Sequence, residues 1–401
     1  KNRISSLFLS TLLILAGIFF VIVSLYISKS VSTVKRISES QKENTIQMSL
    51  IVPTESTIQN LSDIGDLHIE AAFERDFENV DEFRKELKAQ KNLDFKLKEG
   101  KDYVSMANNL LSGNSQIMLL NESFRTIIEE QIPEFSDKTR VVEPITITHQ
   151  VEEVKKNTET EATEGFNLYI SGIDTYGNLI NVSRSDVNII ATVNPKSKKI
   201  LLTTVPRDSY VRIPGRGNDQ YDKLTHAGLY GVNTSRETLE NLLDIDIDYY
   251  ARVNFSSLVR MVDALGGIDV YNPQAFTPRH GKHRFDKGYI HLNGEEALAF
   301  SRERYSLADG DFDRGKNQMR VIEAMISKAL SPSILINYPS VLDVVLESTE
   351  TNMPHDSIIE LVNQEIANSG GWNIESESLD GEGSMGLPSY AMPGYKLFMF
   401  Q

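Results

Sequence analysis

The chain has 401 residues, with 41 Lys and Arg against 56 Asp and Glu and a net charge of −15. This excess of acid argues against general nucleic-acid binding, because phosphate contacts need a basic surface. Hydrophobic residues make up 40% of the sequence, which is enough to build a core. The absence of cysteine excludes disulfides, thiol catalysis and Cys-ligated metal centres.

An uncharged run near the start, from Ile4 to Ser28, is 25 residues long and mostly apolar. About 20 apolar residues cross the hydrocarbon core of a bilayer, so the run predicts a transmembrane helix within residues 1–30. A signal sequence is the alternative, although its apolar core would be shorter and a small-residue cleavage site would follow it. The cations that flank the run do not decide on which side of the membrane the rest of the chain lies.

The next part of the chain predicts a stalk, a small domain and a linker. Residues 31–60 are polar and rich in Ser, Thr and Gln, which is typical of a stalk. Residues 61–150 predict a small α+β domain. Residues 151–164, acidic and poor in apolar side chains, predict a linker whose composition already begins at Glu143. The expected elements of the small domain are helices over 80–97, 103–111 and 122–132 and a strand over 117–120.

Residues 165–401 have the pattern of an α/β domain. Several β-branched and aliphatic runs end at Gly, Pro or Asp, and their continuity predicts strands that are buried on both faces. We therefore expect a mixed central sheet flanked by helices. The expected strands cover 166–174, 186–195, 199–210, 372–379 and 395–400.

Capping signals and apolar periodicity predict the helices of this domain. Thr234 and Glu237 form a capping-box pattern at the start of one helix, and Asn254 is a candidate N-cap for another. Gly266 and Gly267 would end the second helix. The expected helices cover 235–243, 255–265, a segment that begins at 295, 318–330 and much of 332–370.

Arg residues gather at the predicted ends of these elements. Residues 165–335 hold 21 Lys and Arg against 20 Asp and Glu, so an anion could bind there without general repulsion. Ligands commonly bind at strand ends in α/β sheets, and guanidinium groups suit phosphate oxygens. Each Arg alone could form a surface ion pair, but together they favour an anion site. The five are Arg184, Arg207, Arg302, Arg304 and Arg314.

Two places in the domain could hold a metal ion. Asp174 ends the first predicted strand and Asp186 begins the second, and a pair of carboxylates suits a hard cation such as Mg²⁺. His280 and His283 are a second candidate. Cations surround these two histidines, so a solvated loop is the more plausible interpretation there.

Polar residues near the last long predicted helix extend the anion site. Arg302 and Arg304 are two residues apart, so an extended segment would present both on one face. Asp311 and Arg314 precede the helix, and Gln318 follows Arg314 by one helical turn.

The segment from Gly310 to Asn317 nearly spells a phosphate-binding P-loop. It lacks the Ser or Thr that would hold Mg²⁺, it carries acids inside the loop, and no buried strand precedes it. We therefore expect no nucleotide site at this position.

Six motifs between residues 166 and 330 resemble, in order, those of the LytR-CpsA-Psr family. They are SGIDTYG, SRSD, VPRDSYV, KLTHAGLYG, LGGIDV and LNGEEALAFSRER, followed by D-x-x-R-x-x-x-Q. The membrane segment and the small domain look most like family members encoded in streptococcal capsule loci. One departure is that Asn317 and Met319 stand where many members have Arg and Gln.

The resemblance implies a membrane enzyme whose large domain is extracytoplasmic. It would move a glycopolymer, here capsular polysaccharide, from a polyprenyl diphosphate carrier to peptidoglycan, and other capsule-assembly proteins are possible partners. Asp311 would be the general base, with Arg314 orienting it and Arg207 stabilising charge on the departing phosphate. The resemblance implies Mg²⁺ on Asp174 and Asp186, and diphosphate binding by Arg184, Arg207, Arg302, Arg304, Arg314 and Gln318.

The polyprenyl tail would need an apolar slot between the sheet and the helices. Val205, Val259, Val262 and Leu265 are candidates, although ordinary core packing is the better explanation for each of them. Two other functions remain open: a non-catalytic receptor for the carrier lipid that regulates or scaffolds capsule export, and a hydrolase that acts on the same lipid. A transcriptional role is disfavoured by the charge and by the membrane segment.

Overall fold

The computed structural model describes residues 43–150, 162–173, 175, 182–279, 283–308, 310–331, 334, 338–368 and 370–401. The predicted transmembrane helix and most of the predicted linker lie outside these residues. Within them, none of the helices is both long enough and apolar enough to cross a membrane.

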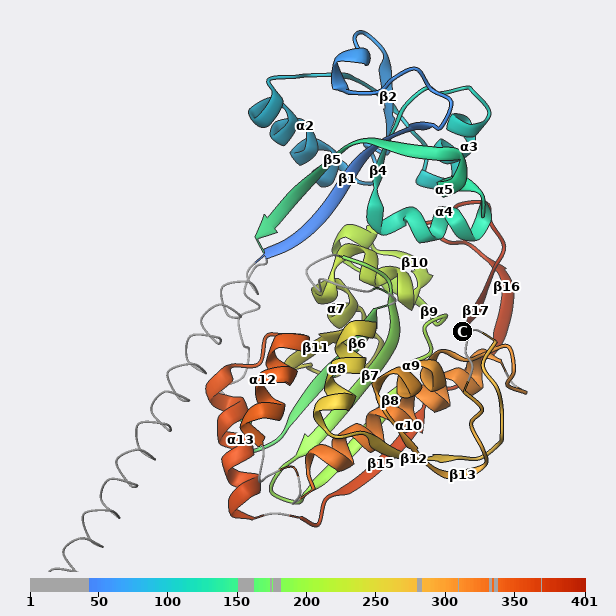
Figure 1. Ribbon diagram of the computed structural model, residues 1–401. Coiled ribbons are helices and arrows are strands. Elements are labelled where there is room, and N and C mark those ends of the chain that lie inside the picture. Colours follow the sequence, from blue (N-terminus) through green and yellow to red (C-terminus); the bar gives the residue numbers. More distant parts are fainter. Residues whose placement is uncertain are drawn as a thin grey trace, which may run out of the picture.

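The N-terminal unit, residues 43–150, is a five-stranded sheet in the order β3-β2-β4-β1-β5 (Figure 1). β2 is parallel to β3 and β4, whereas β1 is antiparallel to β4 and β5. α2 packs on one face through Val80, Phe83 and Leu87, and α3, α4 and α5 pack on the other. The bounds are β1 Glu43–Pro53, β2 His68–Ala71, α2 Phe77–Lys91, β3 Lys96–Glu99, α3 Tyr103–Leu111, β4 Met118–Asn121, α4 Arg125–Gln131, α5 Phe135–Lys138 and β5 Thr139–Gln150.

The N-terminal unit begins earlier than expected and has two long strands that were not predicted, so a stalk over the whole of 31–60 is wrong. β1 occupies part of the predicted stalk, and β5 includes the residues from Glu143 to Gln150 that have a linker-like composition. The two strands pair with each other along their whole length. Ile46, Met48 and Leu50 alternate with polar residues and are buried, so a period of two outweighs the polar composition.

The predicted helix over 80–97 is also too long. α2 ends at Lys91 because Asn92 adopts a left-handed conformation with φ of 55°, a frequent way to end a helix. Residues 96–99 form the edge strand β3 instead. The predicted helix over 103–111 is confirmed as α3, with Asp102 accepting a hydrogen bond from the Ser105 amide at 2.8 Å.

The C-terminal domain is built on a six-stranded sheet in the order β14-β11-β6-β7-β8-β15. β11 pairs in parallel with β6 and β15 with β8, while the other pairs are antiparallel. The expectation of a mixed sheet is therefore confirmed. The strand bounds are β6 Phe166–Ile173, β7 Ser185–Asn194, β8 Lys199–Thr204, β11 Tyr249–Val253, β14 Glu350–Thr351 and β15 Asn373–Ser378.

Helices cover both faces of this sheet. Ile190 points to the face covered by α6 and α7, and its neighbour Ile189 points to the face covered by α10. α8, α9 and α12 pack beside α10 around a separate apolar cluster. The helix bounds are α6 Leu224–Ala227, α7 Val232–Leu243, α8 Phe255–Ala264, α9 Gly294–Arg302, α10 Asp311–Ala329, α12 Tyr338–Ser348 and α13 His355–Ala367. Three hairpins complete the domain: β9 Tyr210–Ile213 with β10 Gln220–Lys223, β12 Ile268–Asn272 with β13 Gly288–Leu292, and β16 Gly383–Leu387 with β17 Leu397–Phe400.

One of the two predicted helix starts is confirmed and the other is wrong. Asn254 caps α8 by accepting a hydrogen bond from the Ser257 amide at 2.9 Å. The capping box of Thr234 does not form, because α7 already begins at Val232, after Gly231 with φ of 103°. The Thr234 hydroxyl instead donates to the Tyr230 carbonyl at 3.3 Å.

The two units are joined through the C-terminal segment, which lies beside the N-terminal unit (Figure 1). Ala391 and Met392 belong to the apolar cluster formed by α3, α4 and α5. Arg75 donates to the Tyr390 carbonyl at 2.5 Å, and its guanidinium lies 4.6 Å from the centre of the Tyr390 ring. The segment is therefore held by both apolar and polar contacts.

Asp222, which is 1% exposed, anchors this segment from the other side. Its carboxylate accepts hydrogen bonds from the Ser389 hydroxyl and the Ala391 amide, both at 2.7 Å, and pairs with His226 Nδ1 at 2.8 Å. Burial alone would raise the pKa of Asp222, but His226 and these donors outweigh it and lower the pKa.

Replacing Asp222→Asn should lower the free energy of unfolding by about 2–4 kcal/mol, because an amide group would leave buried donors unpaired. The lowered pKa stabilises the fold above the unfolded-state pKa of about 3.9, so the difference from wild type should shrink as the pH falls below that value. Urea unfolding at several pH values measures both effects. Asp219→Asn is the matched control, because Asp219 is exposed; equal stability of the two variants would contradict the anchoring role.

Candidate functional site

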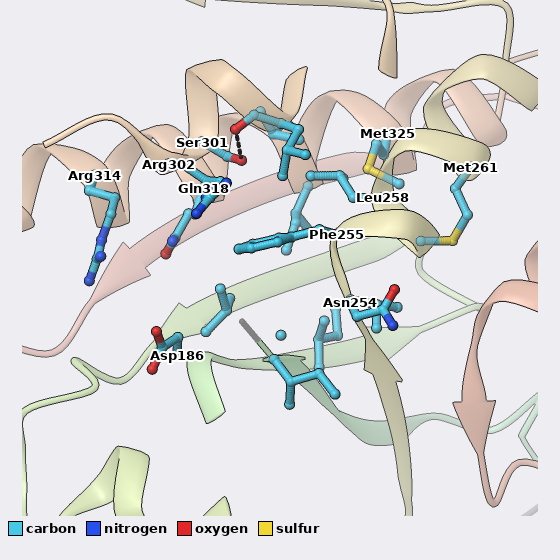
Figure 2. A pocket seen from close by; sticks show the side chains of 18 of the residues that line it. Asp186, Asn254, Phe255, Leu258, Met261, Ser301, Arg302, Arg314, Gln318 and Met325 are labelled. Atoms are coloured by element: carbon cyan, nitrogen blue, oxygen red, sulfur yellow. Dashed lines mark hydrogen bonds between the residues drawn. The ribbon is translucent and has the colours of Figure 1, made fainter. Parts of the chain in front are cut away.

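A cavity of about 790 Å³ lies between the sheet of the C-terminal domain and the helices α8, α9, α10 and α12. Its floor comes from β6, β7 and β11, and its roof comes from the helices. Figure 2 shows Asp186, Arg314 and Gln318 toward one end of the cavity and Met261 and Met325 toward the other. The cavity therefore has a polar end and an apolar end.

The polar end brings together every predicted diphosphate-binding residue. They come from the start of β7, the turn after β8, the end of α9 and the first turns of α10, which are distant in sequence. The residues are Arg184, Arg207, Arg302, Arg304, Arg314 and Gln318, and Asp186 lies among them. These side chains thus meet at one end of the cavity, some from the ends of strands and the others from the helices above them.

Asp186 links several of these elements. Its carboxylate accepts a hydrogen bond from Arg207 at 2.6 Å and another from the Thr225 hydroxyl at 2.8 Å. Burial would raise the pKa of Asp186, but Arg207, Arg184 and Arg314 together with Thr225 lower it below the ordinary value. Asp186 is therefore a carboxylate held in its charged form by the surrounding arginines.

The segment with Arg302 and Arg304 is not extended as expected. Arg302 is the last residue of α9, and its guanidinium lies 4.2 Å from the centre of the Phe255 ring. The helix begins with a capping box at Asn293 and continues as far as Arg302. Arg304 follows in the loop and donates to the Tyr305 hydroxyl at 2.6 Å. Both arginines still line the same cavity.

Sequence reasoning missed the residues that hold this loop. The Glu303 side chain accepts hydrogen bonds from the Arg279 amide at 2.8 Å and the Ser306 amide at 2.7 Å. Burial would raise the pKa of Glu303, but these amide donors lower it. Tyr305 lies between Arg279 and Arg304, whose guanidinium groups are 4.8 and 4.7 Å from the ring centre. Each of these residues looks like an ordinary loop residue in the sequence.

The first turns of α10 supply the rest of the polar end. Asp311 is the first residue of the helix, and its side chain lies outside the described part of the structure. Arg314 and Gln318 line the cavity. Asn317 is buried and accepts a hydrogen bond from Arg320 at 2.7 Å, and Met319 packs in the apolar cluster on the sheet. The positions that depart from the family pattern thus make core contacts.

Sequence reasoning also missed Glu130, which belongs to α4 of the N-terminal unit. Its side chain accepts a hydrogen bond from Arg184 at 2.5 Å and lines the cavity. No sequence pattern relates the two residues, because they are 54 positions apart and lie in different units.

Aliphatic side chains and methionines form the apolar end. Three of the four candidates proposed for it are core residues instead: Val205 packs under α6 and α7, and Val262 and Leu265 pack in the cluster around α8 and α9. Val259, the fourth candidate, is half-buried on α8. The apolar lining includes Leu168, Ile170, Val187, Leu258, Met261, Leu298, Val321, Ile322, Met325, Ile326 and Val345.

Asp186 is the described residue best suited to hold a metal ion. Its two oxygens each accept one hydrogen bond and keep a further lone pair. Mg²⁺ commonly uses one or two carboxylates and completes its shell with water and phosphate oxygens, so the carboxylate fits such an ion. Asp174, the other expected ligand, lies outside the described residues, as does His280. Within the described residues, no group of three or more His, Asp or Glu side chains forms a metal cluster.

This arrangement can bind an amphiphile with an anionic head group and an apolar chain. Guanidinium groups bind phosphate oxygens through directed hydrogen bonds, and the adjoining apolar wall excludes water from a hydrocarbon chain. The volume lies within the usual range for small-molecule sites.

Comparison with known proteins gives two family matches. Residues 135–401 match the LytR_cpsA_psr family. Residues 3–120, less than a third of the chain, match a family described as DNA polymerase processivity factor. The first match covers about two thirds of the chain, including the whole cavity except Glu130.

Two relatives carry the name polyisoprenyl-teichoic acid–peptidoglycan teichoic acid transferase TagU. The Bacillus cereus protein is 38% identical over 200 residues, which are 50% of this chain and 64% of that protein, so the chain spans less than two thirds of its length. The Halalkalibacterium halodurans protein is 37% identical over 228 residues, 56% of this chain and 73% of that protein.

Among solved structures, the crystal structure of Bacillus subtilis TagV has a TM-score of 0.51 and 29% identity to this chain. The likeness covers 59% of this chain and 91% of the TagV chain. The ordered motifs, the family match and the shared fold agree, and the chain belongs to the LytR-CpsA-Psr family.

Proposed function

We propose that this protein transfers a glycopolymer from a polyprenyl diphosphate carrier to peptidoglycan. The observation that carries the proposal is the two-ended cavity, with five arginines at one end and an aliphatic lining at the other. A polyprenyl diphosphate has the same division into a charged head and an apolar chain. The relatives named as teichoic acid transferases support this class of reaction.

In this proposal the arginines hold the diphosphate and one phosphate becomes the leaving group. A hydroxyl oxygen of peptidoglycan forms a new P–O bond to the phosphate that carries the glycopolymer, and the bond from that phosphorus to the bridging oxygen breaks. Polyprenyl monophosphate leaves, and Asp311 takes the hydroxyl proton. Arg207 and Arg314 stabilise the charge that develops on the departing phosphate.

A Mg²⁺ ion held by Asp174 and Asp186 would neutralise part of the charge on the diphosphate oxygens. We further propose that the domain lies outside the cytoplasmic membrane, where peptidoglycan is found, anchored by residues 1–30. Capsular polysaccharide is our proposed polymer, because the N-terminal unit and membrane segment resemble those of capsule-locus members. The relatives named for teichoic acid make that polymer the natural comparison substrate.

The two ends of the cavity can be tested separately with geranyl diphosphate and inorganic diphosphate. Arg302→Ala should weaken binding of both ligands by about 1.5–3 kcal/mol, the range for hydrogen bonds with a charged partner. Met325→Trp should fill the apolar end and weaken only geranyl diphosphate. Titration calorimetry measures both, and a loss of inorganic diphosphate binding in Met325→Trp would contradict the division into two ends.

Removal of divalent metal should slow transfer by at least about tenfold, and added Mg²⁺ should restore it. Asp186→Asn should need more Mg²⁺ for the same rate, because one charged ligand is lost. Transfer of labelled glycopolymer to peptidoglycan in chelator is the measurement. An unchanged rate in chelator would remove the metal from the proposal.

Asp311→Asn should distinguish an enzyme from a binding protein. The amide keeps the size of the side chain but cannot accept the proton, so transfer should fall by about 10²–10⁴ while lipid binding persists. Binding and transfer should be measured on the same preparation. Full activity would leave the base elsewhere, and loss of binding would show that Asp311 organises the arginines.

A further inference from the structure

The N-terminal unit reaches the polar end of the cavity through one side chain. Glu130 lies in the last turn of α4, and among the described residues of 43–150 it alone lines the cavity. Its carboxylate pairs with Arg184 at 2.5 Å, and Arg184 is one of the residues proposed to hold the diphosphate. A phosphate oxygen bound by Arg184 would therefore approach the place that the Glu130 carboxylate occupies.

The two partners differ in burial. The Arg184 side chain is 9% exposed, whereas the Glu130 side chain is 44% exposed. A buried guanidinium is fixed by its surroundings, but a half-exposed carboxylate can rotate into water at little cost. Because the Glu130 carboxylate keeps access to water, it loses little when it leaves Arg184, and a diphosphate with more charge can replace it there.

The backbone that carries Glu130 is firmly placed. Ile127 and Ile128 of α4 are fully buried, and they share an apolar cluster with Leu229 and Tyr230 of the C-terminal domain. The helix therefore stays beside the cavity when the side chain rotates, and the negative charge remains close to any anion bound there.

We propose that Glu130 competes with the diphosphate head group for Arg184 and so weakens its binding. This inference rests on the proposed function and extends it, because it gives the N-terminal unit a direct part in the affinity of the site. An enzyme that must release polyprenyl monophosphate after each reaction benefits from a head-group site that does not bind too tightly.

The test compares Glu130→Gln with wild type in binding of inorganic diphosphate and geranyl diphosphate. Glu130→Gln removes the charge and should tighten both by about two- to fivefold, the upper part of the range for a partly exposed charged pair. Glu129→Gln is the matched control, because it removes the same charge at the neighbouring position. The Glu129 carboxylate accepts a hydrogen bond from the Ser136 hydroxyl and not from Arg184. The control should bind like wild type.

In an Arg184→Gln background the same change at Glu130 should have no effect, because the competition acts through Arg184. Three results would each overturn the inference. Glu130→Gln could bind diphosphate no more tightly than wild type, Glu129→Gln could gain as much affinity as Glu130→Gln, or the gain in affinity could persist in the Arg184→Gln background. If neither wild type nor Glu130→Gln binds diphosphate, the proposed function fails as well. If both bind equally, only the role of Glu130 fails.

Discussion

The ionised carboxylate of Asp186 holds the arginine cluster together. Guanidinium groups from separate elements repel one another when they share a poorly hydrated cavity wall, so a fixed anion must lie among them. Asp186 accepts hydrogen bonds from Arg207 and Thr225, and the charges of Arg184 and Arg314 lower its pKa. Asp186, at the start of β7, thereby interacts with the turn after β8, the short helix α6 and the first turns of α10.

The apolar end of the cavity exists where the helices do not pack fully against the sheet. The spacing of apolar residues in the sequence does not reveal such a gap. The apolar face of α10 packs partly against the sheet, where Met319 and Ile322 lie. Val321 and Met325, however, turn toward α8 and α9 and line the cavity as well. Val262 and Leu265 have the same character in the sequence but are in the closed core, so only the arrangement of the helices separates lining from core.

Local patterns predicted β6, β7, β8 and β15 and the residues at their ends, because both depend on short runs of sequence, but they missed the inner strand β11. The five arginines line one cavity even though Arg302 lies in a helix and Arg304 in a loop, and their binding of a diphosphate stays a prediction. β1 and β5 were missed because each pairs with a strand about a hundred positions away in the sequence. Glu130 was beyond prediction for the same reason: its role is defined by a contact between separate units.

The contacts between the two units fix the position of the N-terminal unit beside the cavity. Asp222 holds the segment around Ser389 from one side, and Arg75 holds it at Tyr390 from the other. The segment shares an apolar cluster with α4. The contacts that hold the C-terminal segment in place therefore also position the helix that carries Glu130. A change of packing at this junction would therefore alter the charge next to Arg184 without touching any residue that binds the head group. The affinity of the polar end is in this sense a property of both units together.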